Sequence, residues 1–363
     1  MKIGILTHHS INNYGAFLQC WALQEKVKSL FPDDEVFIIN YTIAKQDIIN
    51  IGGFFRFYPG RETPKSWLNK ITQPMIFAKA RKKYLHLTKN VHSAEGINSL
   101  GLDCIIIGSD EVWNYLDPKS FFTVKYSDGL DCKRIVAYAP STGKASGNDA
   151  PDYVMKAMQG FTALSARDRG AQVLCENALG VTPQIVCDPT FLTRTPDINN
   201  EKIRALTEKP YVLFYYCNGI PGELKRRIVE NAHQKGLRVL GAGEYDKLYS
   251  DMSVRLTPFE WVELFRRAEY VYTGTFHGVV FSILNRKNFR VFASIESRVR
   301  KINTLLRQFG IPDRSLTEEL EDMEDIDYEK VYEYIEGLRA TSSAYLQRAV
   351  SGEEIKGRSY DTE

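Results

Sequence analysis

The sequence of 363 residues has no long hydrophobic run. Crossing a bilayer takes roughly 20 consecutive apolar residues, and charged residues interrupt the apolar stretches of this chain before that length. The first residues lead into a short apolar strand and then a polar loop, without the long apolar region of a signal peptide. We therefore expect a cytoplasmic protein with no transmembrane segment, which leaves peripheral contact with a membrane open.

Clustered cysteine and an excess of one charge are also missing. The six cysteines form no C-x-x-C pair and no Cys/His cluster, and the formal net charge is only +2. Zinc sites and disulfide frameworks need such cysteine patterns, so we expect neither, and we expect no metal. A nearly balanced charge gives no global electrostatic reason to expect nucleic acid as a partner. The oligomeric state cannot be read from these features.

The length points to more than one domain, because domains usually contain about 100 to 200 residues. The segment 193–209 is polar, contains Pro196 and is the best candidate for a linker. We predict an N-terminal domain over 1–200 with an insertion near 44–93, a C-terminal domain over 201–315 and a helical tail over 316–363.

Short apolar strands alternate with helical patterns in both halves of the chain. A strand over 2–7 is followed by a polar loop, a helix and a strand over 35–41, and a similar alternation runs from 211 to 309. This order builds parallel sheets whose ligands bind at the carboxyl ends of the strands. The predicted fold class is α/β, with two Rossmann-like doubly wound domains in a GT-B-like chain, and we expect the chemistry in the cleft between the domains.

The insertion has a weaker pattern. Aromatic, Pro and Gly residues give way to a basic stretch that contains Lys79, Arg81, Lys82 and Lys83. We predict one amphipathic helix there. A basic run is typical of a solvated helix face, and contact with an anionic lipid carrier or polymer is the alternative.

The first candidate binding loop is H-H-S-I-N-N-Y-G, residues 8–15, which follows the first strand and leads into a helix. Backbone N–H groups at a helix N-terminus favour an anion, and a glycine permits close approach. Asn13, Tyr14 and Gly15 are therefore candidate substrate-binding residues. The alternative is a capping turn that only starts the helix.

The second candidate loop is G-S-D-E-V-W-N, residues 108–114, directly after an apolar strand. Ser109 and Asp110 are candidates here because a carboxylate can orient a hydroxyl or an arginine. Trp113 offers a flat surface for a sugar. The alternatives are that Asp110 caps a helix and that Trp113 lies in the core, where most aromatic side chains are found.

The third candidate site combines Y-A-P-S-T-G, residues 138–143, with S-A-R-D-R-G, residues 165–170. Arg167 follows a strand and precedes a helix, so its planar fork of N–H donors can grip a phosphate or carboxylate. Ser141 is a further candidate. An ion pair of Arg167 with Asp168 or Asp188 is the structural alternative.

The fourth candidate loop is T-G-T-F-H-G, residues 273–278, which follows a strand and opens a helix. The hydroxyls of Thr273 and Thr275, with Gly274 and a helix N-terminus, favour an anion. His277 lies beside them and can exchange protons near neutral pH. A buried, hydrogen-bonded histidine is the commoner case, but the position between strand and helix favours the functional interpretation.

These motifs, with N-N-Y-G-A and C-D-P-T in the same order, resemble the polysaccharide pyruvyl transferase family over about residues 1–309. The resemblance implies a GT-B-like fold and transfer of a pyruvyl group from phosphoenolpyruvate to two hydroxyls of a sugar. The product is a cyclic ketal on a surface polysaccharide such as capsule or exopolysaccharide, and phosphate is released. Phosphoenolpyruvate is then the donor substrate, no cofactor is needed, and we expect a saccharide acceptor on a lipid-linked precursor.

The resemblance also places the family's histidine on His277, as the catalytic acid, and its N-domain arginine on Arg167. Several members have an arginine two residues before the histidine, where this chain has Thr275. Arg298 or Arg300 can supply a replacement charge. Two alternatives stay open: a GT-B glycosyltransferase that uses a nucleotide sugar, and an inactive relative that binds a sugar or anion.

Overall fold

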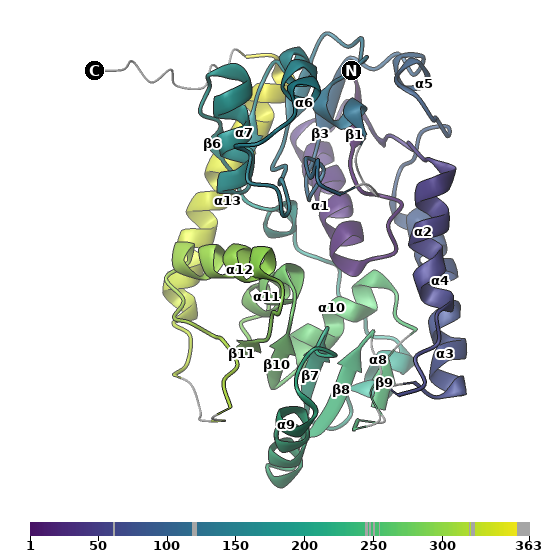
Figure 1. Cartoon of the computed structure of the whole chain (residues 1–363), viewed down its shortest axis with the longest axis vertical. Coiled ribbons are helices and arrows are strands. Elements are labelled where there is room, and N and C mark those ends of the chain that lie inside the picture. Colours follow the sequence, from purple (N-terminus) through teal and green to yellow (C-terminus); the bar gives the residue numbers. More distant parts are fainter. Residues whose placement is uncertain are drawn as a thin grey trace. The chain divides into compact units, whose positions relative to one another are not determined.

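The computed structural model contains two units, each built on its own parallel sheet (Figure 1). The first unit comprises Met1–Asn50, Arg81–Arg194 and Ile335–Glu363, and the second comprises Ile51–Ala80 and Thr195–Tyr334. Helices α2 (Ala44–Phe55), α4 (Gln73–Tyr84) and α13 (Tyr328–Ser351) contain residues of both units. The residues that the structure describes are 1–60, 62–117, 122–243, 246, 248–249, 251–253, 255–318, 320 and 324–353.

The first unit has a four-stranded parallel sheet in the order β2–β1–β3–β4. Strands β3 and β4 are fully buried, as expected where helices cover both faces of a parallel sheet. An isolated parallel bridge joins Val136 of β4 to Ala163, two residues before β5, which pairs with β6. The elements are β1 (Lys2–Leu6), α1 (Tyr14–Leu30), β2 (Glu35–Ile38), α5 (Ala94–Asn98), β3 (Cys104–Ile107), β4 (Ile135–Ala137), α6 (Asp152–Ala157), β5 (Ser165–Ala166), α7 (Arg169–Leu179) and β6 (Gln184–Ile185).

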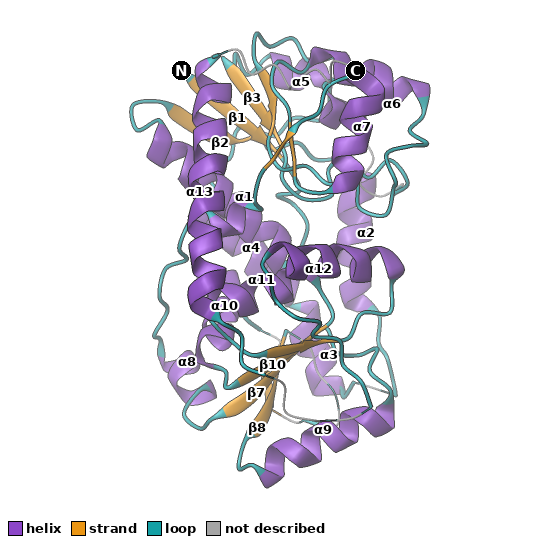
Figure 2. Cartoon of the chain, turned by 90° about the vertical axis from the view of Figure 1, so that its left-hand side faces the viewer, coloured by secondary structure: helices purple, strands orange, loops and turns teal. Residues whose placement is uncertain are grey.

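The second unit has a five-stranded parallel sheet in the order β11–β10–β7–β8–β9, part of which is visible in Figure 2. Numbered within the unit, this order is 3-2-1-4-5 when it is read from β9, which is the order of a doubly wound nucleotide-binding sheet. The elements are α3 (Pro64–Ile71), α8 (Glu201–Leu206), β7 (Tyr211–Tyr215), α9 (Gly222–Gln234), β8 (Arg238–Ala242), β9 (Asp251–Ser253), α10 (Pro258–Arg267), β10 (Tyr270–Thr273), α11 (Phe276–Leu284), β11 (Phe289–Val291) and α12 (Glu296–Gln308).

The predicted α/β class with two parallel sheets is confirmed. Local capping explains where several helices begin, because the first turn of a helix leaves backbone N–H groups without partners inside the helix. Asn13 accepts a hydrogen bond from the N–H of Ala16 at 3.1 Å and so starts α1. Thr257 and Glu260 form a reciprocal capping box at the start of α10, with Pro258 in its first position.

Each unit has its own apolar core. In the first, Trp113 is completely buried, and its ring stacks on that of Tyr126 with centroids 6.3 Å apart. In the second, Trp261 is completely buried and lies 4.4 Å from the ring of Phe265. These aromatic clusters bury large apolar areas on one face of each sheet, which is the main source of stability for units of this size.

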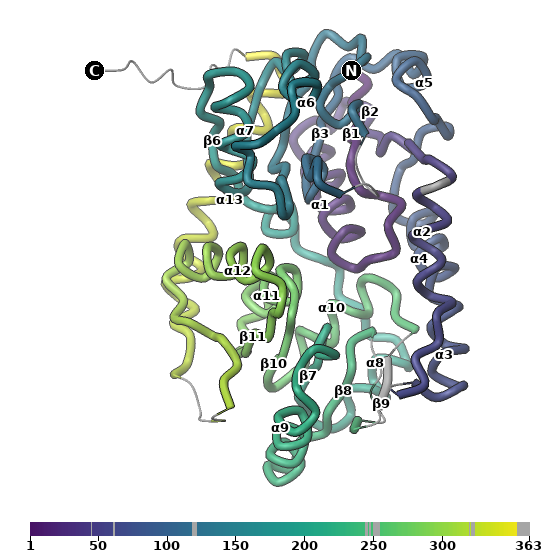
Figure 3. Tube along the Cα trace, viewed as in Figure 1, coloured from purple at the N-terminus to yellow at the C-terminus, as the bar shows by residue number. Residues whose placement is uncertain are grey.

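The prediction of one helix in the insertion is wrong, because α2, α3 and α4 lie in that segment (Figure 3). Proline, which weakens a helical pattern in its interior, here stands at helix starts. Pro64 occupies the first position of α3 after the capping residue Thr63, and Pro74 lies in the first turn of α4. A proline in a first turn loses no intrahelical hydrogen bond, so it favours the start of a helix.

The predicted linker contains the boundary between the two units, which falls after Arg194, and it also contains α8. The predicted domain limits themselves stay a prediction. In the predicted tail, the described residues include one long helix, α13, over Tyr328–Ser351. No helix among the described residues is both long enough and apolar enough to span a membrane.

Candidate functional site

Each sheet has one place where the strand order reverses. In the first unit the chain builds outward in opposite directions from β1 and β3, and in the second it does so from β7 and β10. Ligands of open parallel sheets bind beside the carboxyl ends of the strands at such points. The residues that follow these four strands are therefore the candidates for a functional site.

The loop after β10 forms the start of helix α11. Thr275 is the N-cap, and its Oγ1 accepts a hydrogen bond from the N–H of Gly278 at 3.0 Å. The buried Oγ1 of Thr273 accepts one from the N–H of Thr275 at 3.4 Å. The first-turn N–H groups and the helix dipole together give this end of α11 a partial positive charge. The loop is thus a favourable place for an anion.

Two glycines of this loop are required by close packing. A Cβ atom on Gly274 would lie 2.6 Å from the carbonyl oxygens of both Tyr216 and Phe292. A Cβ atom on Gly278 would lie 1.9 Å from the Oγ1 of Thr273. Neither position has room for a side chain, so Gly274 lets the loop lie against the backbone that follows β7 and β11, and Gly278 leaves space for the Thr273 hydroxyl.

A basic and a titratable side chain accompany this loop. His277 is the second residue of α11, is partly exposed, and meets the ring of Phe276 edge-on with centroids 5.5 Å apart. Arg298 of α12 donates from Nη1 to the carbonyl oxygen of Gly274 at 3.2 Å. Its guanidinium carbon lies 4.9 Å from the ring centroid of Tyr216, a cation–π distance. An imidazole, a cation and a helix N-terminus therefore meet at the carboxyl end of β10.

The loop after β7 completes the second site. Tyr216 is 53% exposed and has a φ of 62°, so its backbone is left-handed and its side chain faces solvent. The Oδ1 of Asn218 is buried, and no donor from the described residues lies within hydrogen-bond distance of it. A buried amide oxygen without a donor is costly, and a ligand hydroxyl would satisfy it.

In the first unit, a buried histidine and a buried lysine meet after β1. Lys125 is 2% exposed, and its Nζ lies 3.1 Å from Nδ1 of His8. A charged lysine has only donors, so Nδ1 is the acceptor in this pair. Burial, helped by the charge of Lys125, lowers the pKa of His8 to about 3. Burial also lowers the pKa of Lys125 to about 7, although Asp110 and Asp117 oppose that shift.

Arg167, the predicted anion clamp, is held by acidic residues of its own unit. Its Nη1 donates to Asp188, and its Nη2 lies 3.5 Å from Oδ1 of Asp110. The side chains of Arg167 and Asp188 are 8% and 1% exposed. Burial alone would lower the pKa of Arg167, but the carboxylates of Asp188 and Asp110 raise it above its usual value. The ion-pair alternative is what the structure contains, so the charge of Arg167 is already balanced.

A model of the polysaccharide pyruvyl transferase family matches residues 13–296. The chain belongs to this family. The match covers more than half of the chain and includes the loops after β3, β7 and β10. Curated proteins give no match.

Solved structures with similar arrangements include several sugar-nucleotide enzymes. UDP-GlcNAc 2-epimerase from Neisseria meningitidis bound to UDP-GlcNAc is 10% identical, with a TM-score of 0.49 over 97% of this chain and 98% of the other. The Streptomyces sp. SF2575 glycosyltransferase SsfS6 is 12% identical, with a TM-score of 0.44 over 97% and 99%. The Escherichia coli ADP-heptose heptosyltransferase II is 9% identical, with a TM-score of 0.42 over 94% and 99%. At these scores the likenesses carry no inference about ligands.

The residues of the loop 8–15 that were predicted to bind substrate form the start of helix α1 in this family member. Asn13 is its N-cap, and Tyr14 and Gly15 are buried in its first turn. His8 and His9, earlier in the same loop, are the residues at the strand end. His9 is 2% exposed, and its Nε2 lies 3.1 Å from Oδ1 of Asn40. The capping alternative therefore describes Asn13.

The other predicted residues of the first unit are mostly buried. Ser109 and Ser141 are 0% exposed, and their hydroxyls donate to the carbonyl oxygen of Ala139 and to Asp168. Trp113 donates from its indole N–H to the carbonyl oxygen of Lys125 at 2.8 Å. Its ring has no exposed face to offer a sugar, so the core alternative describes it.

Sequence reasoning missed Lys125, Tyr216 and Asn218. Tyr216 and Asn218 had a usable signal, because they directly follow an apolar strand of the second half. Lys125 had none, since it lies in a short 3₁₀ turn far from any strand end. Among the described residues, no group of three or more His, Cys, Asp or Glu side chains is placed to hold a metal ion.

Proposed function

We propose that this family member transfers the pyruvyl group of phosphoenolpyruvate to two hydroxyls of a sugar, as a cyclic ketal, and releases phosphate. The observation that supports this most is the loop after β10, where His277, the N-terminus of α11 and Arg298 meet. The phosphate and carboxylate of phosphoenolpyruvate need cations and N–H donors to bind them, and its methylene carbon needs a proton source.

The reaction balances without a cofactor. A proton adds to the methylene carbon of phosphoenolpyruvate, and the oxygen of one sugar hydroxyl bonds to the central carbon. The bond from that carbon to the phosphate oxygen then breaks, and the second hydroxyl oxygen bonds in its place. One hydroxyl proton replaces the proton given to the methylene carbon, and the other leaves with the phosphate, so each turnover requires a group that both donates and accepts protons.

His277 fits the role of that group. It is the titratable side chain of the loop, and the protonated imidazole can donate to the methylene carbon before the neutral ring accepts a proton from a hydroxyl. Its place in the first turn of α11 puts it next to N–H groups that favour the donor's phosphate or carboxylate.

Arg298 fits the role of the cation that several family members carry two residues before the histidine. One of its N–H groups is donated to Gly274, and a guanidinium has five. Thr275, at the position of the missing arginine, instead caps α11 through its hydroxyl. In this proposal Thr275 and Gly274 shape the loop, and Arg298 supplies the charge.

Phosphate release tests the proposal. The protein is incubated with phosphoenolpyruvate and a panel of saccharides, including lipid-linked ones, and released phosphate is measured with and without each acceptor. Acceptor-dependent phosphate release supports pyruvyl transfer. Release of nucleotide from sugar nucleotides, with no turnover of phosphoenolpyruvate, would establish a glycosyltransferase instead. Saccharide binding without either reaction would establish an inactive binding relative.

A further inference from the structure

Apolar side chains are exposed on the segment from the end of α2 to α4. Among the described residues, fourteen large hydrophobic side chains are exposed, and six of them lie between residues 51 and 75. They are Ile51 at 40%, Phe55 at 54%, Phe57 at 41%, Tyr58 at 42%, Leu68 at 54% and Met75 at 59%. Single exposed apolar residues are ordinary, but a run of them in one segment marks an interaction surface.

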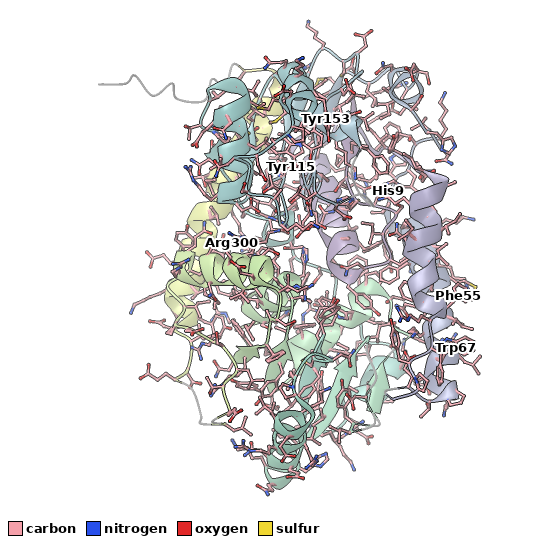
Figure 4. The ribbon with its side chains drawn as sticks, viewed as in Figure 1. His9, Phe55, Trp67, Tyr115, Tyr153 and Arg300 are labelled. Atoms are coloured by element: carbon pink, nitrogen blue, oxygen red, sulfur yellow. The ribbon has the colours of Figure 1, made fainter. Side chains whose placement is uncertain are left out.

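Contacts within the segment hold this surface in place. The indole N–H of Trp67 donates to the carbonyl oxygen of Phe55 at 3.0 Å, and its ring meets that of Phe57 edge-on at 6.2 Å. Figure 4 labels Phe55 on α2 and Trp67 on α3. The amine of Lys70 lies 4.9 Å from the ring centroid of Tyr58 and donates to the carbonyl oxygen of Arg56 at 2.6 Å. Hydrogen bonds and ring contacts within the segment therefore hold these aromatic rings in place.

The same segment concentrates positive charge. Residues 51–80 contain five Lys or Arg and one Glu, a net charge of +4, whereas the whole chain carries +2. Lys65 and Lys79 are exposed. We refer to residues 51–80, all of the second unit, as the basic aromatic surface.

We propose that the basic aromatic surface binds the headgroup region of an anionic lipid bilayer. Aromatic rings and short aliphatic side chains enter the boundary between headgroups and acyl chains, while lysines reach the lipid phosphates. Charge complementarity selects this occupant, because two copies of a surface with a net charge of +4 repel each other. The aliphatic residues Ile51, Leu68 and Met75 suit acyl chains, whereas a single-stranded nucleic acid is bound mainly by stacking on aromatic rings.

Vesicle flotation with the full chain tests the proposal. Vesicles of phosphatidylcholine alone are compared with vesicles that also contain about a third phosphatidylglycerol, at low and high salt. We expect binding to the anionic vesicles that weakens with salt, and little binding to phosphatidylcholine. Equal binding to both vesicles, or no binding, would overturn the proposal. No turnover is involved, so the result is independent of the proposed pyruvyl transfer.

Matched variants locate the surface. The double variants Phe55→Ser with Leu68→Ser, and Lys65→Glu with Lys79→Glu, should each weaken vesicle binding about tenfold or more. Tyr153→Ser on α6 and Lys209→Glu change exposed residues outside the surface and should leave binding unchanged. All six substitutions in these four variants lie at exposed positions, and circular dichroism checks that each variant is folded. Binding that is unaffected by both double variants, or a dimer that they dissociate while the vesicles stay free, would overturn the proposal.

Discussion

The candidate sites of the two units both lie where the strand order of a sheet reverses, but their charged side chains are paired differently. In the first unit, Asp110 follows β3 and pairs with the buried Arg167, which also donates to Asp188, while His8 follows β1 and contacts the buried Lys125. After β7 and β10, the cation Arg298 is only half-buried and is held by a carbonyl oxygen and an aromatic face. A carboxylate partner neutralises the charge of an arginine, whereas a carbonyl oxygen and an aromatic ring hold the arginine in place without neutralising it. The second site is therefore the one equipped to attract an anionic donor.

The largest effect expected from this comparison is on stability in the first unit. Arg167→Ala leaves the buried Asp188 without its cation, and breaking a buried pair in this way costs about 3–5 kcal/mol. Chemical denaturation of the full chain measures it. The matched control is Arg169→Ala, because Arg169 is 67% exposed and its pair with Glu176 should contribute less than about 1 kcal/mol. A well-folded Arg167→Ala variant with only weakened donor affinity would reverse our assignment.

The next largest effect is expected on catalysis in the second unit. His277→Gln keeps approximate size and hydrogen bonding but cannot shuttle a proton near neutral pH, so kcat should fall about 10²-fold or more with stability unchanged. Steady-state phosphate release measures this. His233→Gln, at an exposed position on α9, is the control. Near-normal turnover in a folded His277→Gln variant would leave this histidine a packing residue.

A smaller effect should separate two arginines of one helix. Arg298→Ala removes the cation that holds Gly274, so the KM for phosphoenolpyruvate should rise about tenfold, as for loss of one charge-assisted contact. Arg300 lies two residues further along the same helix, is exposed, and is labelled in Figure 4. Arg300→Ala should leave the KM unchanged. Equal increases in KM for both variants would mean that α12 acts only through its general charge.

The smallest effect at neutral pH, which grows in acid, concerns the buried histidines. Burial lowers the pKa of His8 to about 3 and of His9 to about 4, below the value of 6.5 expected when unfolded. The unfolded chain then binds more protons as the pH falls below about 6.5, so the free energy of unfolding should decrease from there toward pH 4.

His9→Gln, which can keep a hydrogen bond to Asn40, should reduce that acid sensitivity. Denaturation curves at about pH 7 and about pH 5 measure the difference between the variant and the wild type. His233→Gln is again a suitable control, because its side chain is exposed. An identical loss of stability in wild type and His9→Gln would show that other groups cause the acid sensitivity.

Local patterns predicted the parts of the fold that depend on neighbouring residues. The strand before the loop 273–278 was predicted, because a short apolar run there ends at a threonine and a glycine. The loop that follows was also identified from sequence, since Gly278 and the capping residue Thr275 make their contacts within the loop itself. The number of helices in the insertion was underestimated because proline was taken as unfavourable for a helix. Pro64 instead occupies the first position of α3.

The sequence by itself determined the α/β class, the family and the loop that contains His277, because spacing, turns and caps act over a few residues. Only the tertiary structure decided which charges are available. Arg167 meets Asp188 from 21 residues away, and Lys125 meets His8 from 117 residues away. Burial and ion pairing depend on such long-range contacts, so similar strand-end motifs became a closed, balanced cluster in one unit and an accessible cation beside a histidine in the other.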